Sequence, residues 1–92
     1  MKTAFITGAN KGIGFETARQ LLQQGYRVFI GSRDRKRGIE AVGKLISEGF
    51  SNAEFIQIDV TDTESVERAR ASLVEKTDTL DVLINNSGIN GI

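Results

Sequence analysis

Apolar and polar residues change periodicity several times along the chain, and this predicts alternating strands and helices. Short runs rich in β-forming residues predict strands over residues 2–7, 26–31 and 53–59. A continuous apolar run within 81–86 predicts a fourth strand, and such runs are typical of parallel strands buried on both faces. Between the strands, apolar residues recur at helical spacing over 13–22, 39–46 and 66–74. The predicted element order is therefore βαβαβαβ.

This order predicts the α/β fold class, as a Rossmann-type doubly wound parallel sheet. Each connection is long enough to hold a helix, and right-handed crossovers place helices on both faces of a parallel sheet. The chain of 92 residues is large enough for one hydrophobic core, and no proline interrupts it. We therefore expect a single domain over residues 1–92, an incomplete Rossmann domain with about four strands.

Capping residues predict where the helices begin and end. Gly25 and Gly49 follow the first two helical patterns, and glycine commonly ends a helix. Asp34 is placed to cap the second helix, and Thr61 with Glu64 predicts a capping box before the third.

Composition and charge narrow the classes of function. Apolar residues make up 39% of the chain and charged residues 26%, which is typical of a soluble globular protein. Twelve basic and twelve acidic residues cancel, so we expect neither nucleic acid nor a membrane as a partner. The chain has no cysteine and no histidine, which makes a metal site improbable. No signal-peptide pattern opens the sequence, so the expected location is cytoplasmic.

Three glycines lie in the segment 7–14, which joins the first predicted strand to the first predicted helix. Gly8, Gly12 and Gly14 follow a G-x-x-x-G-x-G spacing, in place of the commoner G-x-G-x-x-G. Glycines at such a turn let a pyrophosphate approach the backbone, and the helix N-terminus offers free N–H groups and partial positive charge. Glycines that only relieve backbone strain are the alternative, but the strand before and the helix after favour phosphate binding.

The segment 7–14 resembles the T-G-x-x-x-G-x-G motif of the short-chain dehydrogenase/reductase family, especially its carbonyl-reductase-like members. Two further segments are similar to family motifs: 59–60 after the third strand, where the family's aspartate contacts adenine, and 85–88, which resembles N-N-A-G. Ser87 replaces the usual alanine and adds a hydroxyl of unknown purpose. The resemblance implies a dinucleotide-binding site that includes Gly8, Asn10, Lys11, Gly12, Ile13, Gly14, Asp59, Val60, Asn86, Ser87 and Gly88.

Some of these residues also have a purely structural interpretation. Asp59 could cap the turn that follows its strand, and Asn85 and Asn86 could be turn formers. Asn86 is carried over from the family motif and Asn85 is left as the weaker candidate.

A basic cluster follows the second predicted strand, at residues 33–37. A solvated helix face and a nucleic-acid patch are two possible interpretations. The helix dipole disfavours cations in a first turn, and a bound phosphate would relieve that conflict. Sites specific for NAD place a carboxylate about 20 residues beyond the glycine turn, whereas this chain has Gly31, Ser32 and Arg33 there. We therefore expect Arg33, helped by Lys11, to bind the 2′-phosphate of NADP, with NAD as a possible second cofactor.

The resemblance also implies a chemistry that this chain does not complete. The family uses a Tyr-x-x-x-Lys motif for proton transfer, but the only tyrosine is Tyr26 and position 30 is Ile30, so no catalytic residue is assigned. We expect the N-terminal portion of an oxidoreductase that moves hydride between nicotinamide and a small carbonyl or alcohol substrate. The alternative is a non-catalytic nucleotide-binding or regulatory module. In the family strand order 3-2-1-4, the fourth strand would be an open edge, which predicts self-association.

Overall fold

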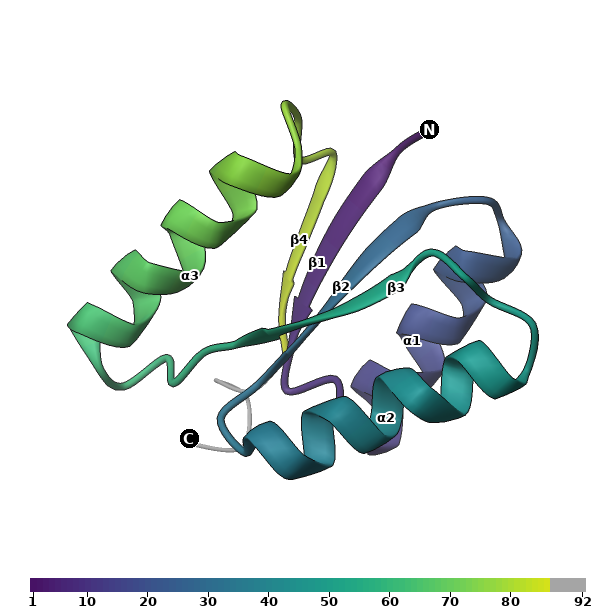
Figure 1. Cartoon of the computed structure of the whole chain (residues 1–92), viewed down its shortest axis with the longest axis horizontal. Coiled ribbons are helices and arrows are strands. Elements are labelled where there is room, and N and C mark those ends of the chain that lie inside the picture. Colours follow the sequence, from purple (N-terminus) through teal and green to yellow (C-terminus); the bar gives the residue numbers. More distant parts are fainter. Residues whose placement is uncertain (87–92) are drawn as a thin grey trace.

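A computed structural model describes residues 1–86 of the chain. Strands and helices alternate in the predicted order: β1 (Thr3–Thr7), α1 (Gly12–Gln23), β2 (Arg27–Ser32), α2 (Arg35–Ser47), β3 (Ala53–Gln57), α3 (Thr63–Lys76) and β4 (Val82–Asn85). The four strands form one parallel sheet in the order β3-β2-β1-β4 (Figure 1). The predicted α/β fold with a doubly wound parallel sheet is confirmed.

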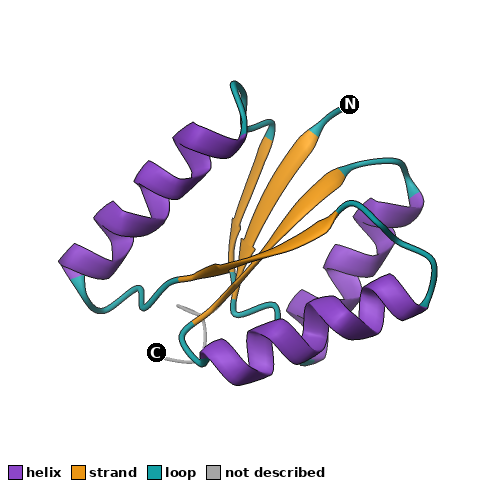
Figure 2. Cartoon of the chain, viewed as in Figure 1, coloured by secondary structure: helices purple, strands orange, loops and turns teal. Residues whose placement is uncertain are grey.

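The helices cover both faces of the sheet, with α1 and α2 on one face and α3 on the other (Figures 1 and 2). The chain moves from β1 through β2 to β3 in one direction and then crosses back to β4, on the far side of β1. Because each crossover is right-handed, reversing the direction moves the connecting helix to the opposite face. The strand order therefore reverses between β1 and β4, and ligands of such sheets bind at the carboxyl ends of the strands near this point.

The hydrophobic core is divided by the sheet into two clusters. In β1, Ala4 and Ile6 pack toward α1 and α2, whereas Phe5 packs toward α3. This follows from the twofold alternation of side chains along a strand. All five residues of β1 are buried, as are five of the six residues of β2, so the two central strands form a fixed base for the loops at their ends.

Two expectations about local structure are wrong. The third helix is capped by Asp62, whose carboxylate accepts a hydrogen bond from the Glu64 N–H, and no Thr61 capping box forms. The Glu64 N–H already donates to Asp62, and Thr61 instead faces Asp59, to which both its N–H and its hydroxyl donate. The fourth strand is not buried on both faces, since Leu83 is 63% exposed. The reason is that β4 lies at the edge of the sheet, beside an apolar groove that α3 does not fill.

The other predicted helix ends are confirmed. The Asp34 carboxylate accepts a hydrogen bond from the Arg37 N–H at 3.1 Å and caps α2. Gly25 and Gly49 follow the ends of α1 and α2 with φ of 91° and 102°, in the left-handed region that favours glycine.

Candidate dinucleotide-binding site

The three glycines of the first turn have different physical roles. Gly8 and Gly12 have φ of 66° and 64°, so the turn needs glycine there for its backbone conformation. Gly14 is needed for close packing, because a Cβ would lie 2.8 Å from the Gly8 carbonyl oxygen and 2.8 Å from Nδ2 of Asn86. Among residues 1–86, no atom lies within 4 Å of a Cβ built on Gly12, so these residues leave open space over the middle of the turn.

The N-terminus of α1 is not capped by a side chain. Lys11 is its N-cap residue and makes no side-chain hydrogen bond to the first turn, which contains no acidic residue. By contrast, α2 and α3 are capped by Asp34 and Asp62. The Ile13 side chain is 80% exposed and does not cover the N-terminus of α1. The first N–H groups of α1 and their partial positive charge are therefore available to an anion.

A cavity of about 660 Å³ lies at the carboxyl ends of the strands, beside this turn. The structure brings seven of the residues selected from the sequence to its wall: Gly8, Asn10, Lys11, Arg33, Asp59, Val60 and Asn86. Gly12 lines a neighbouring hollow, together with Asn10 and Lys11. Ile13 and Gly14 line neither, and Ser87 and Gly88 lie outside the described residues.

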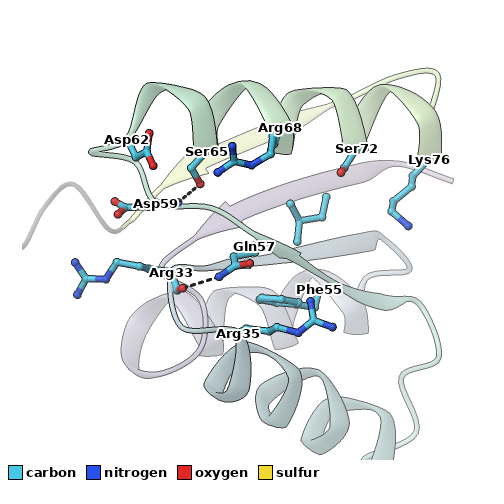
Figure 3. A pocket seen from close by; sticks show the side chains of 11 residues that line it. Arg33, Arg35, Phe55, Gln57, Asp59, Asp62, Ser65, Arg68, Ser72 and Lys76 are labelled. Carbon is cyan, nitrogen blue, oxygen red and sulfur yellow. Dashed lines mark hydrogen bonds between the residues drawn. The ribbon is translucent and has the colours of Figure 1, made fainter.

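Asp59 is held rigidly at the wall of the cavity. Its Oδ1 accepts hydrogen bonds from the Thr61 hydroxyl at 2.6 Å and from the Thr61 N–H at 3.0 Å. Its own N–H donates to the buried Ser65 hydroxyl of α3 at 2.8 Å (Figure 3). The hydrogen bonds from Thr61, and to a smaller extent the charge of Arg33, lower the pKa of the Asp59 carboxyl. The carboxylate is therefore charged at neutral pH.

The two asparagines at the end of β4, Asn85 and Asn86, face different sides. Asn86 donates from Nδ2 to the Gly8 carbonyl oxygen at 3.2 Å and lines the cavity. Asn85 accepts at Oδ1 from the Thr7 hydroxyl at 2.9 Å and lines the apolar groove beside α3. Of the two candidates, Asn86 is thus the one that reaches the glycine turn.

The basic cluster divides between two surfaces. Arg33 and Arg37 line the cavity together with Lys11, whereas Arg35 lines only a second hollow over β3, whose wall Arg33 also joins. Figure 3 shows the Arg33 and Arg35 side chains extending in different directions. The sequence prediction named Arg33 and Lys11 but did not select Arg37. Its spacing was the available signal, because Arg37 lies four residues after Arg33 and in the first turn of α2.

Comparisons with known proteins agree with this geometry. The family model described as short chain dehydrogenase matches residues 2–92. The (-)-isopiperitenone reductase of Mentha piperita is 46% identical in an alignment of 92 positions, which covers 97% of this chain and 29% of that protein. The structure of menthone neomenthol reductase from Mentha piperita has a TM-score of 0.87 and 45% identity, covering 92% of this chain and 31% of that one. A crystal structure of actinorhodin polyketide ketoreductase with NADPH has a TM-score of 0.86 and 35% identity, covering 92% of this chain and 32% of that one.

The chain therefore spans between 29% and 32% of the length of these relatives. Over residues 1–86, no helix is long and apolar enough to cross a membrane. In the same part of the chain, no group of three or more acidic side chains comes together as a metal site would require.

Proposed function

Because this chain belongs to the short-chain dehydrogenase family, we propose that it binds NADP(H) as the nucleotide-binding portion of an oxidoreductase. Residues 1–92 would form the N-terminal portion of an NAD(P)-binding Rossmann domain. The observation that carries the proposal is the position of Lys11 and Arg33 on one cavity, beside a strand end without a carboxylate. Asp34 follows that strand end, but its carboxylate already caps α2 and faces Arg37. The described chain therefore favours a phosphate over a ribose 2′-hydroxyl.

The geometry of the described chain fits the parts of this cofactor. The pyrophosphate would lie on the uncapped start of α1, over the open space at Gly12 and against the N–H groups of Ile13 and Gly14. The adenine would lie near Asp59 and Val60, and the 2′-phosphate between Arg33 and Lys11. Arg37 adds a third cation to the same wall.

The motif after β4 would contribute to the same site. Asn86 bonds the Gly8 carbonyl and so ties the end of β4 to the glycine turn, which keeps the two loops together. Asn10 lines the cavity next to Lys11. Ser87 and Gly88 are proposed cofactor contacts on the family motif alone.

We propose hydride transfer between nicotinamide and a small carbonyl or alcohol substrate as the activity of the whole enzyme. The bound nicotinamide would supply or accept the hydride. The names of the relatives support this class of reaction, since one is an isopiperitenone reductase and another a ketoreductase. The 92 residues include no Tyr-x-x-x-Lys motif, so they offer no proton-transfer tyrosine and bind cofactor without completing the chemistry.

Calorimetric titration of Arg33→Ala with NADP⁺ and NAD⁺ tests the cofactor assignment. A charge-assisted contact to phosphate contributes about 1.5–3 kcal/mol, so the variant should lose a roughly ten- to hundredfold preference for NADP⁺. Its affinity for NAD⁺ should be nearly unchanged, because the pyrophosphate contacts remain. Arg35→Ala is the matched control, since Arg35 lines the hollow over β3 but not the cavity. Equal affinities for the two cofactors in the unmutated chain, or the same loss in both variants, would refute the assignment.

We also propose that the chain self-associates through β4 and the groove beside it. In residues 1–86 no strand pairs with the outer edge of β4, so a strand of a second chain could pair there. The groove has a volume of about 650 Å³, and Val74, Leu80 and Leu83 on its wall are 71%, 41% and 63% exposed. A second copy of the chain would cover these side chains and supply the missing strand partner.

Three expectations from the sequence, on nucleic acid, membranes and location, stay predictions. Neither nucleic acid nor a membrane is proposed as a partner, because the charges of the chain balance. A cytoplasmic location is proposed as well. Fractionation of cells that express the protein would test the location, and binding assays with duplex DNA and anionic vesicles would test the partners.

A further inference from the structure

The Arg33 guanidinium has no partner of its own in the part of the chain that the structure describes. It makes no hydrogen bond or ion pair there, and its charge acts on Asp59 only through space. The direction of a long, unpartnered side chain depends on the backbone that carries it. The interactions that hold the backbone at residue 33 therefore decide where this charge lies.

That backbone is held on three sides. The Ser32 hydroxyl accepts a hydrogen bond from the Asp34 N–H at 3.1 Å and donates to the Asp34 carbonyl at 3.0 Å, which closes a tight loop around Arg33. The Ile58 N–H donates to the Ser32 carbonyl at 3.0 Å. The Arg33 carbonyl itself accepts from the Gln57 side-chain amide at 3.3 Å (Figure 3).

Of these groups, Gln57 has no other evident structural role. Ser32 is 3% exposed at the end of β2, and Asp34 caps α2, so both also support the fold. Gln57 is an exposed residue at the end of β3, opposite Ser32 in the strand register. Its amide reaches one residue beyond the last paired position and extends the contact between β3 and β2 to Arg33.

We infer that Gln57 is a positioning residue for cofactor selection, which acts by fixing the Arg33 carbonyl so that the guanidinium faces the 2′-phosphate. The inference rests on the proposed NADP(H) function and adds a specificity-determining residue to it. Loss of the amide would leave the Arg33 backbone free on the β3 side. The guanidinium would then spend less of its time at the phosphate, and only ligands with a 2′-phosphate would bind less tightly.

Gln57→Met tests this, because methionine has similar length and no hydrogen-bond donor. The probes are adenosine 2′,5′-bisphosphate and 5′-AMP, which differ only in the 2′-phosphate, titrated by calorimetry into the full chain. The ratio of their affinities should fall by about two- to tenfold, as expected for the loss of one exposed hydrogen bond. The affinity for 5′-AMP and the melting temperature should stay the same. Gln20→Met, on the exposed side of α1, is the matched control and should change nothing.

A double-mutant cycle separates positioning from other effects. In an Arg33→Ala background, Gln57→Met should leave the ratio unchanged, because there is no guanidinium left to position. If Gln57→Met lowers the affinity ratio equally in both backgrounds, the inference is wrong. It is also wrong if Arg33→Ala lowers the ratio and Gln57→Met alone leaves it unchanged. If the unmutated chain shows no preference for the bisphosphate, the proposed function fails and the inference fails with it.

Discussion

Two glycines of α2 provide a sharp test of the packing between this helix and β3. Gly38 is buried against the sheet, and a Cβ on it would lie 2.1 Å from Cε1 and 2.5 Å from Cδ1 of Phe55. Carbon atoms in contact are normally about 3.5–4.0 Å apart. Gly43 lies on the exposed side of the same helix, where no atom of the described chain lies within 4 Å of such a Cβ. Replacing each glycine by alanine therefore adds a methyl group at a filled position in Gly38→Ala and at an open position in Gly43→Ala.

The two substitutions should change the free energy of unfolding in opposite directions. Alanine is favoured over glycine inside a helix by about 1 kcal/mol, so Gly43→Ala should raise the free energy of unfolding by roughly 0.5–1 kcal/mol. In Gly38→Ala the Phe55 ring must move by more than an ångström or α2 must lift from the sheet, and such overpacking costs about 1–3 kcal/mol. Because the helical gain is common to both variants, their difference should isolate the overpacking and equal roughly 1–3 kcal/mol.

Urea unfolding, followed by circular dichroism, measures both variants against the parent chain. For a chain of this size each 1 kcal/mol also shifts the melting temperature by about 4–8 °C, which gives an independent check. If Gly38→Ala were as stable as Gly43→Ala, the close contact between α2 and Phe55 would be wrong.

Three further predictions concern stability, activity and assembly. Lys76 and, more weakly, Arg27 hydrogen-bond Glu54 and lower its pKa. Glu54→Gln should therefore lower the free energy of unfolding by about 0.5–1 kcal/mol at pH 7, and this difference should vanish as the pH falls below about 4; a constant difference would contradict the ion pairs. The 92-residue chain should not reduce any ketone with NADPH, because it has no Tyr-x-x-x-Lys motif; a loss of NADPH absorbance above a buffer control would contradict this. Sedimentation should show self-association that Leu83→Lys weakens and the control Ile46→Lys, on α2, does not; a strictly monomeric parent chain would refute the proposed interface.

Most of the fold could be predicted from the sequence because periodicity and crossover handedness are both local rules. They gave the seven elements, and the reversal that places β4 beside β1 followed once the resemblance supplied the strand order. Helix starts were harder where two capping residues are adjacent. Thr61 and Asp62 both suit an N-cap; in the structure Asp62 accepts from the first turn of α3, while Thr61 faces Asp59 and donates to it twice. Periodicity does not report such competition.

In the candidate site, too, local sequence patterns predicted some features and missed those that depend on the folded chain. The glycine turn could be found from its spacing, but the reason for Gly14 could not, because it lies in contact with Asn86, 72 residues further along the chain. Arg37 was not selected because in the sequence it is one of several cations at the start of a helix. Only the fold shows that it lines the same cavity as Arg33 and Lys11. Burial of the fourth strand was overestimated for a related reason. An apolar run reports the hydrophobicity of the residues and not what covers them, and in the described chain Leu83 is left open.

Asp59 shows why a structural and a functional interpretation of one residue need not exclude each other. The sequence allowed this carboxylate to cap a turn or to face a cofactor, and in the structure the turn uses only one of its two oxygens. Oδ1 accepts both Thr61 hydrogen bonds and closes the turn, while no hydrogen bond from the described residues reaches Oδ2. The bonds to Thr61 and Ser65 fix the carboxylate on the cavity wall before any ligand arrives. A contact from Oδ2 to adenine would then require little ordering of the side chain, and the structural role would increase the affinity that the functional role provides.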